Sequence, residues 1–251
     1  MLDVFFLSYN EEFADENFEL VQLVAPHAKR VHGIKGIFNA HKECARQSLT
    51  KNFYVIDADA ILEPGFYFDF EPRDDIDWWA GIPQTACVHV WRSKNPINDL
   101  LYGYGGVKLF PKQALLDLED WHIDFTNSAS GNFKAMPQVS NVTGFNTSPY
   151  NTWKSAFREC TKLASGVIKS KYDGHVDKNT TDRLDTWCTV GADRLYGKDA
   201  LRGANEGRAY GEKYANDVKM LNNINDFDWL NSVWEGKVSI KWPVFKHWRC
   251  K

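Results

Sequence analysis

The chain has 251 residues, of which 43% are hydrophobic and 25% charged, a composition typical of a globular protein with one large domain or one domain and a helical appendage. Its net charge of −3 argues against a dedicated nucleic-acid-binding module, which would need a basic surface. No segment approaches the ~20 consecutive apolar residues of a membrane span. The five dispersed cysteines contain no CxxC pair, so we expect a cytoplasmic protein with reduced thiols and no membrane partner.

The first sixty residues alternate between strand and helix patterns. We predict a buried strand over 4–7, a helix over 13–25 that Pro26 ends, a short strand over 29–34, a helix over 36–49 and a strand over 53–56. Strands that alternate with helices are typical of α/β folds. The pattern therefore predicts an α/β fold with a mainly parallel sheet.

The pattern changes after residue 62. Short strands are predicted over 77–82, 86–91 and 106–111, and the segment 119–150, rich in Ser, Asn, Thr and Gly, is typical of a long loop. Helical spacing follows over 153–169, 181–193, 198–217 and 217–236, before a last strand over 238–248. We therefore predict four regions: a core at 1–118, a flexible loop region at 119–152, a helical region at 153–236 and a strand region at 237–251 that returns to the core.

Two aspartates one residue apart end the third strand, in "NFYVIDADAIL" (residues 52–62). In a strand, Asp57 and Asp59 would point the same way, at the carboxyl edge where open α/β sheets bind ligands. Two neighbouring carboxylates repel each other unless a cation lies between them, and Mg²⁺ and Mn²⁺ prefer oxygen ligands. The pair therefore indicates a metal site for phosphate oxygens, and the alternative is a solvated turn with two capping aspartates.

Residues 3–65 resemble the donor half of GT-A glycosyltransferases. The resemblance is carried by "VFFLSYNEE" (4–12) and by "GIKGIFNAHKECARQSLTKNFYVIDADAIL" (33–62), in which a strand with a polar end, a glycine, a helix and a DxD strand follow in the family's order. The resemblance implies a Rossmann-like GT-A fold with a helical C-terminal region. It also implies metal-dependent transfer of a sugar from a nucleotide-diphosphate donor, with a UDP-sugar favoured, to a hydroxyl group.

The resemblance also implies roles for individual residues. Asp57 and Asp59 would hold Mn²⁺ or Mg²⁺, with His247 as a third ligand. The remaining donor-binding positions are those that match the loop after the first strand, the segment that lines the nucleotide and the glycines beside the sugar or acceptor: Ser8, Tyr9, Asn10, Glu11, Lys35, Gly36, Lys42, Gly105 and Gly106.

An inverting reaction would need a general base for the acceptor hydroxyl, whereas a retaining one would not. The Glu119–Asp120 pair matches the family's acidic pair and makes Asp120 one candidate, and Asp124 at the edge of the predicted loop is the other. The sequence leaves the stereochemistry open.

The segments 102–111, 139–166 and 185–197 resemble, less closely, a group of GT-A-like proteins of tailed phages. That resemblance implies hydroxylated cytosine in phage DNA as a candidate acceptor and the host cytoplasm as the location. A glycan, protein or small-molecule acceptor is the alternative. Two further alternatives are a DxD phosphatase of the haloacid dehalogenase type and a non-catalytic nucleotide-binding protein. The phosphatase motif normally continues with Thr or Val, whereas Ala60 follows here.

Overall fold

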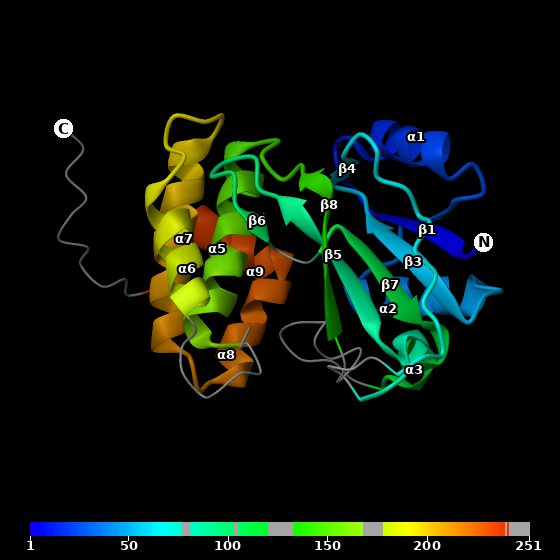
Figure 1. The fold of residues 1–251 in the computed structure, drawn as a ribbon. Helices are drawn as coiled ribbons and strands as arrows, with labels where there is room; N and C mark the ends of the chain where they lie inside the picture. The colour runs from blue at the N-terminus through cyan, green and yellow to red at the C-terminus, as the bar shows by residue number, and fades with distance from the viewer. Residues whose placement is uncertain (77–80, 103–104, 120–132, 168–177, 239, 241–251) are drawn as a thin grey trace. The chain divides into compact units, whose positions relative to one another are not determined.

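In the computed structural model the chain forms two compact units, residues 1–144 and 145–251 (Figure 1). The structure describes residues 1–76, 81–102, 105–119, 133–167, 178–238 and 240. The predicted region boundaries at 118, 152 and 236 stay predictions, because the contacts divide the chain at one point only, after Gly144.

The first unit begins with the predicted alternation of strand and helix. In chain order the elements are β1 (Asp3–Ser8), α1 (Ala14–Val24), β2 (Lys29–His32), α2 (Ile37–Gln47) and β3 (Asn52–Asp57). They are followed by β4 (Ala60–Leu62), the 3₁₀ turn η1 (Gln84–Ala86), β5 (Val88–Lys94), β6 (Leu101–Tyr102), β7 (Val107–Pro111), α3 (Lys112–Asp117) and β8 (Phe133–Thr143). The predicted strand over 77–82 falls largely outside the described residues.

The sheet is mixed, so the prediction of a mainly parallel sheet is wrong. Its order is β2-β1-β3-β7-β5-β8-β4, with β6 paired to β5. β1 runs parallel to β2 and β3, and β5 runs parallel to β8, but β7 is antiparallel to both β3 and β5, and β4 is antiparallel to β8. The helices α1 and α2 connect the parallel strands β1, β2 and β3, whereas no α-helix separates β4, β5, β6 and β7 in the described part of the chain.

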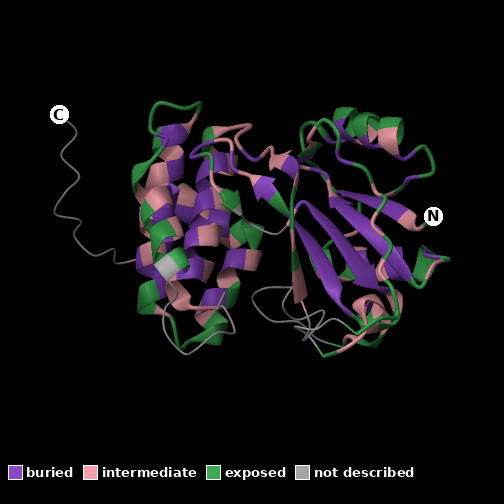
Figure 2. Ribbon diagram, in the orientation of Figure 1, coloured by how far each residue is buried: buried purple, intermediate pink, exposed green. Residues whose placement is uncertain are grey.

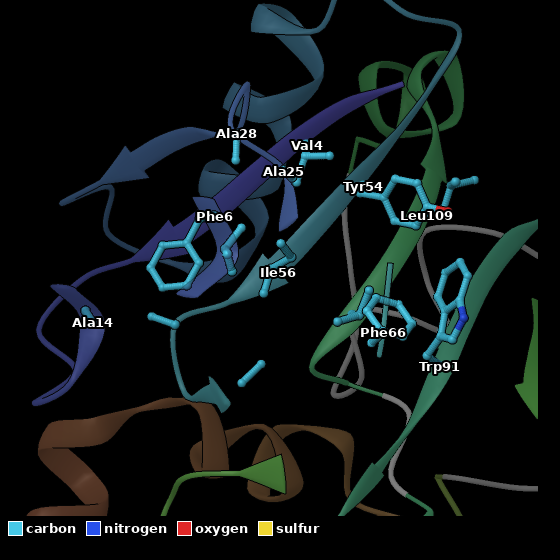
Figure 3. Packing of buried hydrophobic residues seen from close by; sticks show 14 residues of the cluster. Val4, Phe6, Ala14, Ala25, Ala28, Tyr54, Ile56, Phe66, Trp91 and Leu109 are labelled. Atoms are coloured by element: carbon cyan, nitrogen blue, oxygen red, sulfur yellow. The ribbon is translucent and has the colours of Figure 1, made fainter. Parts of the chain in front are cut away.

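Apolar residues cover both faces of the sheet, because its strands alternate between two buried sides (Figure 2). One face carries Val4, Phe6, Tyr54 and Ile56, which pack with residues of α1 (Figure 3). The opposite face, with Phe5, Phe53, Val55 and Phe110 among its members, packs with α2 and α3. β1, β3 and β7 are therefore buried on both sides, and among their residues only Asp3 and Asp57, each at a strand end, are partly exposed.

The predicted loop over 119–150 contains regular structure. β8 occupies residues 133–143, and the next helix begins at Pro149 rather than near Trp153. The side chain of Ser148 accepts a hydrogen bond from the amide of Asn151 and caps this helix, and a proline at the first turn is compatible with a helix start.

The second unit is helical in its described part, as predicted. Its elements are α5 (Pro149–Ser165), α6 (Lys178–Thr189), α7 (Gly197–Lys213), α8 (Val218–Asn222), the 3₁₀ turn η2 (Asn223–Asn225) and α9 (Phe227–Trp234). The predicted helix over 217–236 is thus split in two, because Asp226 caps a new helix by accepting hydrogen bonds from the amides of Asp228 and Trp229. The predicted strand over 238–248 lies almost entirely outside the described residues.

Three glycines of α7 bring its backbone against that of α5. A Cβ built on Gly203, Gly207 or Gly211 would lie 2.3, 2.2 and 2.5 Å from the carbonyl oxygens of residues 153, 157 and 161. The two sets of residues advance together in steps of four, so the helices run parallel. The hydroxyl of Thr161 also donates to the carbonyl of Gly207 at 3.1 Å. We refer to these three glycines as the glycine seam.

Among the described helices, none combines the length and the apolar character that a membrane crossing requires.

Candidate functional site

The carboxyl ends of the three parallel strands lie next to one another. Ser8 at the end of β1 pairs in register with His32 at the end of β2, and Leu7 pairs with Asp57 at the end of β3. Because all three strands run in the same direction, the polar residues that follow them gather at one edge of the sheet.

The Asp57–Ala58–Asp59 turn is held by backbone hydrogen bonds from several elements. The amide of Asp57 donates to the carbonyl of Gly106 at 2.9 Å, and the amide of Gly144 donates to the carbonyl of Asp59 at 2.6 Å. The buried side chain of Asn17 on α1 donates to the carbonyl of Ala58 at 2.8 Å. The backbone is therefore fixed from three directions, and the two carboxylates are presented by a rigid turn.

A buried lysine neutralises the first aspartate. Lys108 in the middle of β7 donates from Nζ to Oδ2 of Asp57 at 2.7 Å. The lysine side chain is only 3% exposed, whereas that of Asp57 is 30% exposed. Burial raises the pKa of the Asp57 carboxyl, and the positive charge of Lys108 opposes that rise.

The second aspartate lacks such a partner among the described residues and is surrounded by negative charge. Burial most of all, and then the neighbouring carboxylates of Asp57 and Glu11, raise the pKa of Asp59 to about 7, and the positive charge of Lys108 opposes this rise. Glu11 follows β1, and its Oε2 accepts a hydrogen bond from the amide of Tyr9 at 2.7 Å. The edge therefore holds three carboxylates against one buried lysine, an excess of negative charge that a bound cation would relieve.

The four predicted donor-binding residues at the end of β1 differ in their exposure: Ser8 is buried, whereas the three residues after it are exposed. The hydroxyl of Ser8 accepts a hydrogen bond from Nε of Arg30 at 2.7 Å and lies 2.9 Å from Nδ1 of His32, so this buried serine joins β1 to β2. Tyr9 is 46% exposed, and its ring is therefore accessible to a ligand. Asn10 and Glu11 are exposed as well. Their contacts with a nucleotide stay predictions.

The predicted nucleotide-lining residues lie at the start of α2. Gly36 precedes the helix with φ of 89°, a conformation that favours glycine, and it leaves the first turn without a side-chain cap. Lys35 is exposed, and the ammonium of Lys42 lies 5.0 Å from the ring centre of Phe38. Lys35 and Lys42 thus contact solvent or an aromatic ring in this structure, and their role at a phosphate stays a prediction.

Gly106 lies directly beside the aspartate turn, as the hydrogen bond to Asp57 shows. A Cβ at this position would lie 2.4 Å from both Nδ2 and Oδ1 of Asn141 in β8, so any larger residue would have to displace the buried Asn141 side chain. The buried Asn141 accepts hydrogen bonds at Oδ1 from Ser93 and Ser140, while its Nδ2 has no hydrogen-bond partner among the described residues. Gly105 precedes Gly106 and is half-buried.

Three residues that position the turn escape the sequence analysis: Asn17, Lys108 and Asn141. Lys108 had a detectable signal, because it interrupts the apolar strand of residues 107–110 that follows two glycines. Asn17 occupies the inner face of a helix, where a polar side chain is unusual enough to notice. Asn141 had no detectable signal in the sequence, since it lies in a segment rich in polar residues.

The predicted general bases Asp120 and Asp124 and the predicted third ligand His247 lie outside the described residues. In the part of the chain that the structure describes, no group of three or more His, Cys, Asp or Glu side chains is placed to hold a metal ion. Asp57, Asp59 and Glu11 are thus not arranged as a complete three-carboxylate metal site, and further ligands would come from a bound substrate, from water or from residues not described.

No known protein family matches the chain, and a search of curated proteins finds no related sequence.

Proposed function

We propose that this chain is a metal-dependent glycosyltransferase of the GT-A type, which moves a sugar from a nucleotide-diphosphate donor, preferably a UDP-sugar, to a hydroxyl acceptor. One observation carries the proposal. At the carboxyl end of β3, a turn held by hydrogen bonds from several elements presents Asp57 and Asp59, and burial, followed by the charges of Asp57 and Glu11, raises the pKa of Asp59 to about 7.

The donor set suits a hard divalent cation such as Mn²⁺ or Mg²⁺, because all its atoms are carboxylate oxygens. Asp59 would hold the cation, together with the carboxylate oxygen of Asp57 that does not accept from Lys108. When bound, the metal would stabilise the negative charge of the departing diphosphate. Lys108 holds Asp57 in one orientation, and Asn17 and Gly106 hold the backbone that carries both aspartates.

The donor would occupy the edge formed by β1, β2 and β3. The exposed ring of Tyr9 offers a stacking surface for the base, and Gly36 leaves the backbone amides at the start of α2 accessible to a phosphate. For the acceptor we propose hydroxylated cytosine in DNA, with Asp120 or Asp124 as the base if the reaction inverts the sugar. Support for this acceptor comes from the resemblance to phage proteins alone.

The first test replaces Asp59 with asparagine, which keeps the shape and removes the charge. We expect Asp59→Asn to lose Mn²⁺-dependent binding of UDP, measured by isothermal titration calorimetry. Its stability should stay equal or rise, because the lost carboxylate is repelled by its neighbours. The matched control is Asp75→Ala, an exposed aspartate paired with Arg73 in another loop of the same unit. Retention of parental UDP–Mn²⁺ affinity in Asp59→Asn would disprove the proposal.

The second test identifies the reaction and the acceptor. The protein is incubated with a panel of UDP-sugars and Mn²⁺, and release of UDP is followed with and without DNA containing hydroxymethylcytosine. Stimulation by modified but not by unmodified DNA supports the proposed acceptor, and it should weaken steeply as salt rises. Turnover without such stimulation would assign a glycan, protein or small-molecule acceptor, and hydrolysis of phosphate monoesters instead would favour the phosphatase alternative.

A further inference from the structure

A chain of hydrogen bonds joins β1 and β2 at the carboxyl edge of the sheet. Nε of Arg30 donates to Oγ of Ser8 at 2.7 Å, and the same Oγ lies 2.9 Å from Nδ1 of His32. Arg30 is itself held in place, because its Nη1 donates to Oδ1 of Asp15 and its guanidinium lies 6.0 Å from the ring centre of Phe6. Ser8 is buried, whereas His32 is exposed. The chain therefore begins on a fixed cation and ends on an accessible ring.

The direction of these hydrogen bonds determines which nitrogen of His32 carries the proton. A guanidinium has donors only, so the oxygen of Ser8 accepts from Arg30. The hydroxyl of Ser8 then has one hydrogen to donate, and Nδ1 of His32 is the acceptor within its reach among the described residues. In the neutral ring the proton is therefore on Nε2. The described part of the chain offers no hydrogen-bond partner to this Nε2–H, which is thus available to a ligand.

The position of His32 relates this donor to the aspartate turn. The strand order is β2-β1-β3, so β2 is the outermost of the three parallel strands. His32 pairs in register with Ser8, and Leu7 pairs with Asp57. Two strand spacings separate His32 from Asp57, which is about 10 Å between their Cα atoms. A nucleoside diphosphate with its phosphates at the aspartates would cross β1 and reach β2 with the base edge that is farthest from the ribose.

We propose that His32 is a specificity-determining residue that selects the base of the nucleotide, with its Nε2–H donating to the carbonyl oxygen O4 of uracil. This inference rests on the proposed function, because it requires a nucleoside diphosphate at this edge. Uracil, like thymine, has the acceptor O4 where cytosine has an amino group. The N–H of His32 pairs with the first and faces another donor in the second, so this edge should prefer UDP to CDP. Ser8 and Arg30 are positioning residues, because they act through the ring of His32.

The first test compares UDP with CDP, which share the ribose and the diphosphate and differ at this edge of the base. Binding of each to the full-length protein is measured with Mn²⁺ by isothermal titration calorimetry. We expect the parent to bind UDP about fivefold more tightly than CDP, the worth of one hydrogen bond of about 1 kcal/mol. His32→Phe keeps a ring and removes the donor, so its two affinities should agree to within about twofold. The matched control is His27→Phe, an exposed histidine at the opposite end of β2, which should keep the parental ratio.

The outcomes separate this inference from the proposed function. A parental ratio in His32→Phe, or a parent protein that binds CDP as tightly as UDP, would overturn the role of His32 and leave the metal site standing. Asp59→Asn should weaken UDP and CDP alike, because both carry the same diphosphate. A parent protein that binds neither nucleotide with Mn²⁺ would overturn both proposals.

The direction of the hydrogen bonds has a readout that needs no nucleotide. Long-range ¹H–¹⁵N spectra, at a pH at which the ring is neutral, show which nitrogen of His32 carries the proton. We expect Nε2 to carry it in the parent, and Ser8→Ala to give a mixture of both forms and to lower the ratio of UDP to CDP affinity to about half or less. A proton on Nδ1 in the parent would overturn the assignment. A Ser8→Ala protein that fails to fold leaves the spectra of the parent and the affinities of His32→Phe decisive.

Discussion

The ion pair between Lys108 and Asp57 gives the sharpest test of the site's electrostatics. The ammonium is 3% exposed and lies 2.7 Å from a carboxylate that is 30% exposed. Removing one partner of a buried ion pair typically costs about 3–5 kcal/mol, because the other charge stays buried without compensation. Because the two groups are unequally exposed, we expect the removal of Lys108 and the removal of Asp57 to lower the free energy of unfolding by different amounts.

Lys108→Met keeps the aliphatic packing and leaves the Asp57 carboxylate unpaired. Water can reach this carboxylate, and burial already raises its pKa and so favours its protonated form. We expect it to lower the free energy of unfolding by about 2 kcal/mol. Asp57→Asn leaves an ammonium with almost no exposure, and its cost should be larger, about 3 kcal/mol. The double variant removes both charges of the pair and should cost about 1–2 kcal/mol, so the two changes should be coupled by about 3–4 kcal/mol.

The assay is urea denaturation of the parent, both single variants and the double variant at pH 7, followed by tryptophan fluorescence. If the two single costs add to within about 0.5 kcal/mol in the double variant, Lys108 and Asp57 are not coupled and the ion pair contributes nothing specific. A larger cost for Lys108→Met than for Asp57→Asn would contradict the exposure argument separately.

Two further predictions concern packing and pH. Gly207→Ala should destabilise the protein by about 2 kcal/mol in urea denaturation, because a Cβ lies 2.2 Å from the carbonyl oxygen of Phe157 and this overpacking outweighs a helix-propensity gain of about 1 kcal/mol. Lys213→Ala, at an exposed position of α7, is the control, and a Gly207→Ala protein as stable as the parent would contradict the close approach. Burial, followed by the charge of Lys108, lowers the pKa of His41 from 6.5 to about 3. Between pH 6.5 and about 3, His41 therefore binds a proton in the unfolded state but not in the folded state. The free energy of unfolding should then fall by about 1.4 kcal/mol for each pH unit below 6.5. In His41→Gln the free energy of unfolding should fall by about 1 kcal/mol less between pH 6 and pH 5 than in the parent. If the free energies of unfolding of parent and variant change in parallel with pH, the lowered pKa of His41 is wrong.

The first half of the sheet could be predicted because its information is local. The alternation of buried strands and amphipathic helices up to Asp57 fixes both the element order and the parallel pairing of β1, β2 and β3. The same rule misleads beyond β4, because it applies to strands that helices separate, and no α-helix lies between β4 and β7 in the described part of the chain. Antiparallel returns such as β7 depend on long-range pairing that sequence periodicity does not report.

The sequence does not indicate β8, and the register of this strand shows why. Its sequence contains Pro137, which a regular central strand excludes. In the structure Trp91 pairs with Met136 and Arg92 pairs with Val139, so the register shifts between these two pairs. Pro137 lies within this shift, where the missing amide hydrogen of a proline does not interrupt a regular ladder of hydrogen bonds. A strand interrupted in this way, with mostly half-exposed side chains, resembles a polar loop in sequence.

The site shows the same division between local and long-range information. Asp57 and Asp59 could be placed at a strand end from the apolar run before them. The sequence could not reveal that Lys108, 51 residues later, would neutralise the first of them, because that contact follows from the antiparallel register of β3 and β7. Ser8 has the right position for a ligand loop, but its hydroxyl is engaged by Arg30 and His32.

The glycine seam restricts how the second unit can move. Many proteins respond to ligands by shear, in which packed helices slide past one another through small repacking of their side chains. Along the seam the contact is made by backbone atoms, with no side chain of α7 available to change rotamer. A slide of α7 by one residue would bring side chains such as Ala204 or Arg208 into the space that the glycines leave. The two helices are therefore expected to move together, as a single rigid element, in any conformational change of this protein.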